Sequence, residues 1–91
     1  MNRFEHQSIV VTGAAQGIGA AITRLLLQEG ANVFALDNNA EALAALADEQ
    51  LSPRLHPKVV DITRPHEVEL AIAAIDNQHP LTGLVNNAGV L

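Results

Sequence analysis

IVVTGAAQGIG, residues 9–19, is the stretch of sequence that decides the fold of this chain. A β-branched run ends at Gly13, and two more glycines follow at Gly17 and Gly19. An apolar helical pattern begins at Ile18, so the order predicts a strand, a tight turn and a helix. Gly13 permits a sharp exit from the strand, Gly17 lets a ligand approach bare backbone, and Gly19 lets the helix pack close to the sheet. Because a helix N-terminus attracts anions, we expect a dinucleotide phosphate site; a structural turn without a ligand is the alternative.

Two motifs near opposite ends of the chain resemble those of one enzyme family. Residues 12–19, TGAAQGIG, have T-G-x-x-x-G-x-G spacing and resemble the coenzyme motif of the short-chain dehydrogenase/reductase family. Residues 86–89, NNAG, resemble that family's second signature. The resemblance covers essentially the whole chain. It implies an oxidoreductase that transfers hydride between a nicotinamide coenzyme and an alcohol or ketone.

Composition narrows the class of protein. Ninety-one residues allow one small domain, residues 1–91, interpreted as the N-terminal coenzyme-binding part of such an enzyme. Ten acidic residues against five basic ones argue against a nucleic-acid or anionic membrane surface. The sequence has no cysteine, and its four histidines lack metal-ligand spacing, so no metal site is expected. No apolar run approaches the ~20 residues that span a bilayer, and a cytoplasmic location is expected.

Alternating periodicities predict an α/β chain of the order β-α-β-α-β-α-β. Strands are expected at about residues 8–12, 32–36, 56 or 57 to 60, and 83–86. Helices are expected over residues 17–29, after Asn38 or Asn39, and after a Thr63 cap. The buried stripe of the first helix is expected to contain Ile18, Ala21, Ile22, Leu25 and Leu26. Short links specify a Rossmann-type three-layer fold with a mostly parallel sheet, strand order 3-2-1-4, and a ligand crevice above strands one and four.

Asp37 follows the second strand, eighteen residues after Gly19. A carboxylate there can accept both ribose hydroxyls of an adenosine, and it would repel a 2′-phosphate, which favours NAD over NADP. Gln16 agrees, because NADP-binding relatives often carry a basic residue before the second glycine. The alternative is that Asp37 only begins the cap of the next helix.

The family resemblance implies further coenzyme contacts. Asp61 and Ile62 resemble the aspartate-hydrophobic pair that flanks the adenine ring, although Asp61 alternatively caps a strand-to-helix turn. Asn87 is expected either to steady the sheet or to line the nicotinamide ribose, and Gly89 to contact the coenzyme. The complete predicted set is Gly13, Gln16, Gly17, Ile18, Gly19, Asp37, Asp61, Ile62, Asn87, Ala88 and Gly89.

The catalytic residues that the family resemblance implies are missing. The family uses a tyrosine, a lysine four residues later and a serine, with an asparagine from a later helix. This sequence has no tyrosine, its one lysine is Lys58 in the expected third strand, and its serines are Ser8 and Ser52. We therefore name no catalytic residue and expect the 91 residues alone to be inactive. We expect a fold truncated after the fourth strand, whether as a truncated product, part of a longer homo-oligomeric protein or a domain completed by another chain.

Several functional hypotheses remain at this point. Residues 12–19 together with AGVL, residues 88–91, are similar to 2,3-dihydro-2,3-dihydroxybenzoate dehydrogenases of catechol siderophore synthesis. Sugar-alcohol and hydroxysteroid dehydrogenases share nearly the same motifs. The alternative from another class is a nucleotide-binding module without catalysis, or an inactive remnant. A nucleotide-sugar epimerase or flavin-binding relative shares the first βαβ unit, but the NNAG segment argues against it.

Overall fold

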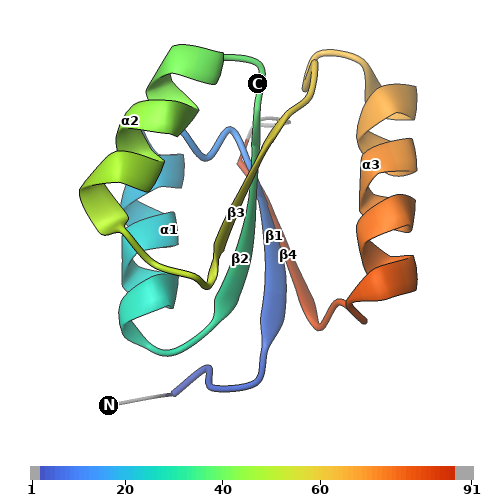
Figure 1. The fold of residues 1–91 in the computed structure, drawn as a ribbon. Helices are drawn as coiled ribbons and strands as arrows, with labels where there is room; N and C mark the ends of the chain where they lie inside the picture. The colour runs from blue at the N-terminus through green and yellow to red at the C-terminus, as the bar shows by residue number, and fades with distance from the viewer. Residues whose placement is uncertain (1–2, 88–91) are drawn as a thin grey trace.

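A computed structural model describes residues 3–87 and contains seven regular elements in strict alternation (Figure 1). In chain order they are β1 (Ser8–Thr12), α1 (Gly17–Gln28), β2 (Asn32–Asp37), α2 (Ala40–Gln50), β3 (Leu55–Val59), α3 (Pro65–Gln78) and β4 (Gly83–Asn86). The strands match the ranges expected from sequence to within one residue at each end, except that β3 begins one or two residues before its expected start. None of the helices in residues 3–87 has the length and apolar character needed to cross a membrane.

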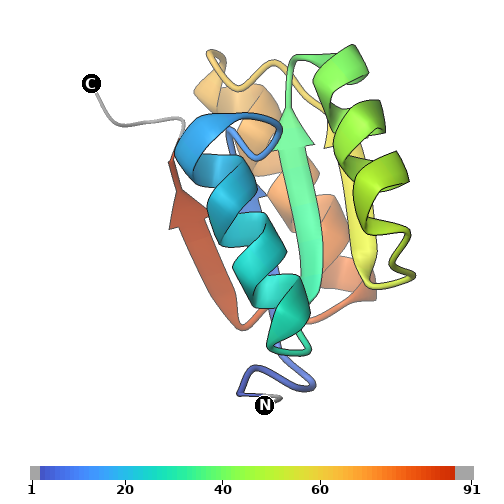
Figure 2. The ribbon, with the colours of Figure 1, turned by 90° about the vertical axis from the view of Figure 1, so that its left-hand side faces the viewer.

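The four strands form one parallel sheet in the order β3-β2-β1-β4, which confirms the Rossmann-type arrangement. In the register, Val10 of β1 lies between Phe34 of β2 and Leu84 of β4. Helices α1 and α2 cover one face of the sheet, and α3 covers the other (Figures 1 and 2). The carboxyl ends of all strands therefore meet at one edge, where the glycine-rich turn lies.

The core is aliphatic and divides between the two faces of the sheet, because successive strand residues point to opposite sides. The face under α1 and α2 buries alternate residues of the central strands against leucines of both helices: Ile9, Val11, Val33, Ala35, Leu26, Leu27, Leu43 and Leu46. The face under α3 buries a smaller set, Val10, Phe34, Leu36 and Ile75. One helix covers this second face, and Leu84 on the edge strand β4 is 56% exposed.

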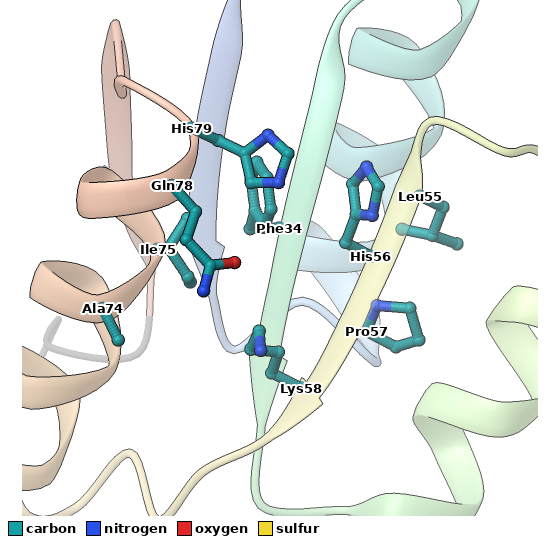
Figure 3. Close-up of a pocket in the computed structure, with 9 residues that line it drawn as sticks. All are labelled: Phe34, Leu55, His56, Pro57, Lys58, Ala74, Ile75, Gln78 and His79. Atoms are coloured by element: carbon teal, nitrogen blue, oxygen red, sulfur yellow. The ribbon is translucent and has the colours of Figure 1, made fainter.

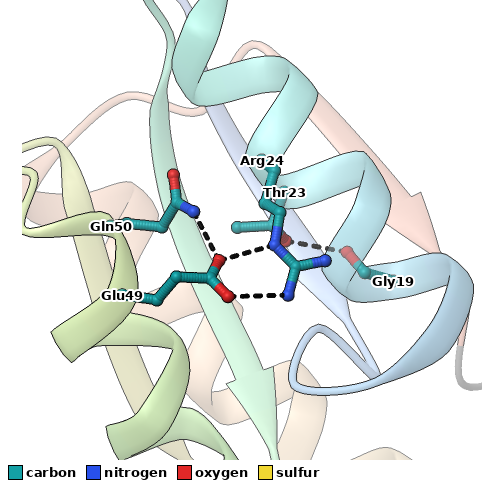
Figure 4. Close-up of polar contacts among 5 residues, drawn as sticks. All are labelled: Gly19, Thr23, Arg24, Glu49 and Gln50. Atoms are coloured by element: carbon teal, nitrogen blue, oxygen red, sulfur yellow. Dashed lines mark hydrogen bonds and ion pairs between the residues drawn. The ribbon is translucent and has the colours of Figure 1, made fainter.

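The predicted buried stripe of α1 was right for Leu26, and Ile22 is partly buried against the core, but it was wrong for the other residues. Ile18 is 72% exposed and Leu25 is 54% exposed, whereas the buried residues are Gly19, Ala20, Thr23, Leu26 and Leu27. Helical spacing fits both stripes, and the close approach of Gly19 to the Gly13 carbonyl places the Gly19 side of the helix against the turn. Thr23 satisfies its buried hydroxyl by donating to the Gly19 carbonyl at 2.9 Å (Figure 4).

Two helix ends, the C-terminal end of α1 and the N-cap of α3, each differ by one residue from the positions expected from sequence. Helix α1 ends at Gln28 rather than residue 29, and Gly30 follows in a left-handed conformation with φ 93°. Helix α2 has Asn39 as its N-cap, one of the two expected candidates, and the Asn39 side chain accepts from the Ala42 amide at 3.0 Å. The expected Thr63 cap of α3 was wrong, because Arg64 is the N-cap and Pro65 begins the helix.

An ion pair joins α1 to α2 on the surface (Figure 4). The Arg24 guanidinium donates to both carboxylate oxygens of Glu49, at 2.6 and 3.2 Å, and the Gln50 amide donates to the same carboxylate at 2.6 Å. These hydrogen bonds, Arg24 first, lower the pKa of Glu49. The contact links two helices that share one sheet face, and because both side chains are nearly half exposed it adds little to stability.

Candidate functional site

The N-terminus of α1 has neither a capping side chain nor an acidic residue in its own first turn. Gln16 is the N-cap, its side chain makes no capping hydrogen bond, and the first turn of α1 contains no acidic residue. By contrast, α2 has the Asn39 cap and Glu41 in its first turn, and α3 has Glu67 there. The partial positive charge of α1 is thus available to an external anion.

The backbone of the turn has the conformation that the glycines were expected to permit. Gly13 and Gly17 adopt left-handed conformations with φ 64° and 58°. A Cβ atom built on Gly17 would have no heavy atom within 4 Å, so this glycine borders open space. Bare backbone beside open space at a helix N-terminus is the environment that a phosphate group requires.

Gly19 has a packing role at the same turn. A Cβ atom at this position would overlap the carbonyl oxygen of Gly13 and would lie 3.0 Å from the side-chain nitrogen of Asn87. That nitrogen donates to the Gly13 carbonyl at 3.2 Å. The end of β4 is therefore attached to the turn after β1, which supports the structural role expected of Asn87, while its contact with a ribose stays a prediction.

Asn86 makes a related contact one residue earlier. The Thr12 hydroxyl donates to the side-chain oxygen of Asn86 at 3.1 Å, and the two residues pair across β1 and β4. Sequence reasoning missed this contact of Thr12. The signal was present, because a threonine at the last position of a strand lies opposite the first asparagine of NNAG in a 3-2-1-4 sheet.

Asp37 is buried and fixed beside the turn. Its side chain is 7% exposed; one carboxylate oxygen accepts from the Ala15 amide at 3.0 Å and the other from the Asn39 amide at 3.0 Å. The Ala15 contact was not foreseen, because nothing in the sequence indicates which loop amide turns toward β2. Asn39 is the N-cap of α2, so the bond from its amide to Asp37 also supports the alternative that Asp37 begins the cap of that helix. Contact with a ribose stays a prediction.

Asp61 lies in the turn after β3 and is held locally. One oxygen of its carboxylate accepts from both the backbone amide and the hydroxyl of Thr63, and the other lies 3.4 Å from the Arg64 guanidinium. The Thr63 hydroxyl, then the Thr63 amide, lowers the pKa of Asp61. This geometry supports the turn interpretation, although contact with an adenine is not tested by it.

Ile62 lies next to the ends of the central strands. With Thr12 and Asn86 it lines a cavity of about 270 Å³ that continues to Leu84 on the face of the sheet under α3. Asp37 contacts the turn through Ala15, Asn87 contacts Gly13, and Ile62 lines a cavity with Thr12 at the end of β1. The hydrogen bonds and ion pair of Asp61 are local, with Thr63 and Arg64. The predicted contacts Ala88 and Gly89 lie outside the described residues.

Comparison with known proteins identifies the family. The model of the family described as short chain dehydrogenase matches residues 7–91. A 3beta-hydroxysteroid dehydrogenase 2 from Eggerthella lenta is 38% identical over 93% of this chain, and a farnesol dehydrogenase from Aedes aegypti is 37% identical over 100% of it. The structure of a citronellol catabolism dehydrogenase from Pseudomonas aeruginosa PAO1 superposes with a TM-score of 0.83 at 30% identity, over 93% of this chain.

The chain spans only part of these relatives. It covers 34% of the hydroxysteroid dehydrogenase, 39% of the farnesol dehydrogenase and 37% of the citronellol catabolism dehydrogenase. The matched part contains the glycine-rich turn, the buried Asp37, and the two asparagines at and just after the end of β4. On these matches and this geometry, the chain belongs to the short-chain dehydrogenase family.

Proposed function

We propose that this chain is the coenzyme-binding N-terminal part of an NAD-dependent short-chain dehydrogenase. The observation that carries the proposal is the uncapped N-terminus of α1, which has no acidic residue in its first turn and faces open space at Gly17. A dinucleotide diphosphate satisfies such a helix end. In the complete enzyme, the nicotinamide ring exchanges hydride with an alcohol or ketone carbon.

The preference for NAD over NADP is argued from Asp37. Two backbone amides hold this carboxylate in a buried position, which prevents it from swinging away from a ribose that lies at the end of β2. A 2′-phosphate there would meet a negative charge with no cation from Gln16 to offset it. The residues of the turn thus bind the diphosphate, and Asp37 selects the unphosphorylated ribose.

The experiment compares NADH and NADPH affinity, by fluorescence or calorimetry, before and after Asp37→Asn. Loss of the charge should reduce the preference for NADH at least about tenfold, which corresponds to ~1.4 kcal/mol. Asp76→Asn is the matched control, because Asp76 accepts from the Leu81 amide near the far end of α3. An unchanged preference in a folded Asp37→Asn variant would refute the ribose role, and failure of wild type to bind either nucleotide would refute the proposed function.

The narrower proposal is oxidation of a 2,3-dihydro-2,3-dihydroxybenzoate in siderophore synthesis. Its support is the similarity of residues 12–19 and 88–91 to that group of enzymes.

For the 91 residues by themselves, the absence of tyrosine favours a second function, nucleotide binding without hydride transfer. Substrate-dependent NADH turnover by the 91-residue chain would contradict this second function, and NADH binding without turnover would support it.

A further inference from the structure

A groove lined by two histidines and a lysine lies between β3 and the last turn of α3 (Figure 3). Its volume is about 380 Å³, within the range of small-molecule sites. His56 pairs with Phe34 in the register of the sheet, and His79 follows the C-terminal end of α3. Because α3 runs back toward the amino ends of the strands, the groove lies away from the glycine-rich turn.

Aromatic rings form one wall of the groove. The imidazole of His56 stacks on the buried ring of Phe34, with centroids 4.6 Å apart and planes inclined by 16°. The His79 ring lies 5.4 Å from Phe34 and 6.1 Å from His56. Three rings held together by a β-strand register and a helix end present a preformed surface for a planar ligand.

The ionisable side chains that line the groove are all basic. They are His56 and Lys58 from β3 and His79 from the end of α3, with the neutral amide of Gln78 beside them (Figure 3). Burial, then the charges of His79 and Lys58, lowers the pKa of His56. The acidic residues Glu69 and Asp76 of α3 line a different cavity, toward β4.

The C-terminal end of α3 repels an anion in the groove only weakly. The C-terminal end of α3 carries a partial negative charge of about half an elementary charge, and the Ile75 carbonyl already accepts from the His79 amide at 2.7 Å. The full positive charge of Lys58 exceeds it, and no carboxylate among the lining residues neutralises the ammonium group. The groove is therefore suited to a small anion.

We propose that this groove is a binding site for a small planar carboxylate, with its flat part against the imidazoles of His56 and His79 and its carboxylate at Lys58 and Gln78. The rings supply stacking area, and the lysine and amide supply donors. This site and the coenzyme site share no lining residue. Binding at one can therefore be measured without the other.

Benzoate at millimolar concentrations is the probe, titrated into the ¹⁵N-labelled chain and followed by NMR. We expect saturable shifts at Phe34, His56 and His79, and an affinity at least about tenfold lower in Lys58→Met, as removal of a charged hydrogen-bond donor predicts. Lys58 is exposed on an edge strand, so the variant should fold. His66→Gln, an exposed histidine in the first turn of α3, is the matched control and should bind benzoate like wild type.

Two further ligands separate the parts of the proposal. Cyclohexanecarboxylate has the same charge but no flat ring, and inorganic phosphate has charge alone; both should bind at least several-fold more weakly than benzoate. Equal affinity for phosphate and benzoate would overturn the proposal that the groove prefers a planar ligand. No saturable benzoate shift, or benzoate binding that Lys58→Met leaves unchanged, would overturn the site itself. NADH binding is expected to be unaffected by Lys58→Met, so failure here is distinct from failure of the proposed function.

Discussion

Gly19→Ala is expected to damage the fold where α1 meets the sheet. The added Cβ atom would overlap the Gly13 carbonyl oxygen, which is backbone and cannot move aside as a flexible side chain would. It would also press on the side-chain nitrogen of Asn87, 3.0 Å away, which donates to the same carbonyl. Relief requires α1 to move outward from the sheet.

The size of the effect follows from overpacking. Inserting one methyl group into a closely packed site costs about 1–3 kcal/mol, and a backbone obstacle places this site near the upper limit. The loss of the Asn87 contact adds about 1 kcal/mol if the hydrogen bond is broken. We therefore expect Gly19→Ala to lower the free energy of unfolding by roughly 3–4 kcal/mol, a large part of the stability of a small domain.

Gly17→Ala is the matched comparison, two residues earlier in the same turn. Its Cβ atom would meet no heavy atom within 4 Å, and the strain of φ 58° alone should cost about 1–2 kcal/mol. The new methyl group would, however, occupy the open space assigned to the diphosphate. Urea denaturation and NADH titration of both variants should show the larger stability loss in Gly19→Ala and a binding loss in folded Gly17→Ala. Gly19→Ala with wild-type stability, or Gly17→Ala with wild-type NADH affinity, would refute the reasoning.

Two further predictions concern stability. Leu51 ends α2 in a left-handed conformation with φ 47° and is 83% exposed, so Leu51→Gly should raise the free energy of unfolding by about 0.5–1 kcal/mol in urea denaturation, whereas Leu51→Ala should not. His56 has a lowered pKa because of burial and the neighbouring charges of His79 and Lys58. As the pH falls, His56 therefore binds a proton at a higher pH in the unfolded chain than in the folded chain. The free energy of unfolding should consequently decline as the pH falls below about 6.5, the ordinary pKa of histidine. His56→Gln should flatten this decline in denaturation curves between pH 8 and 5; an equal decline in both proteins would contradict the assignment.

The sequence predicted the order of elements, the strand order and nearly every boundary, because apolar runs, Gly30 and Pro65 are local signals. It was only partly right about the buried face of α1, where Leu26 is buried but Ile18 and Leu25 are exposed. Two stripes of α1 satisfy helical spacing, and the choice between them depends on a contact between Gly19 and Gly13 that only the folded chain contains. The spacing of apolar residues shows which residues share a face of a helix. Which face is buried depends on where the backbone of α1 comes closest to the turn after β1.

The candidate site shows the same division between local pattern and tertiary contact. The glycines of the turn were predictable, because each backbone conformation or close approach that they permit is a property of the turn. The hydrogen bond from the Ala15 amide to Asp37 was not, since it joins residues 22 positions apart. That bond is also what connects the two functions proposed here: Asp37 helps to hold the loop that binds the diphosphate and, with the same carboxylate, selects the ribose. A substitution at this residue should consequently change affinity for both coenzymes as well as the ratio between them.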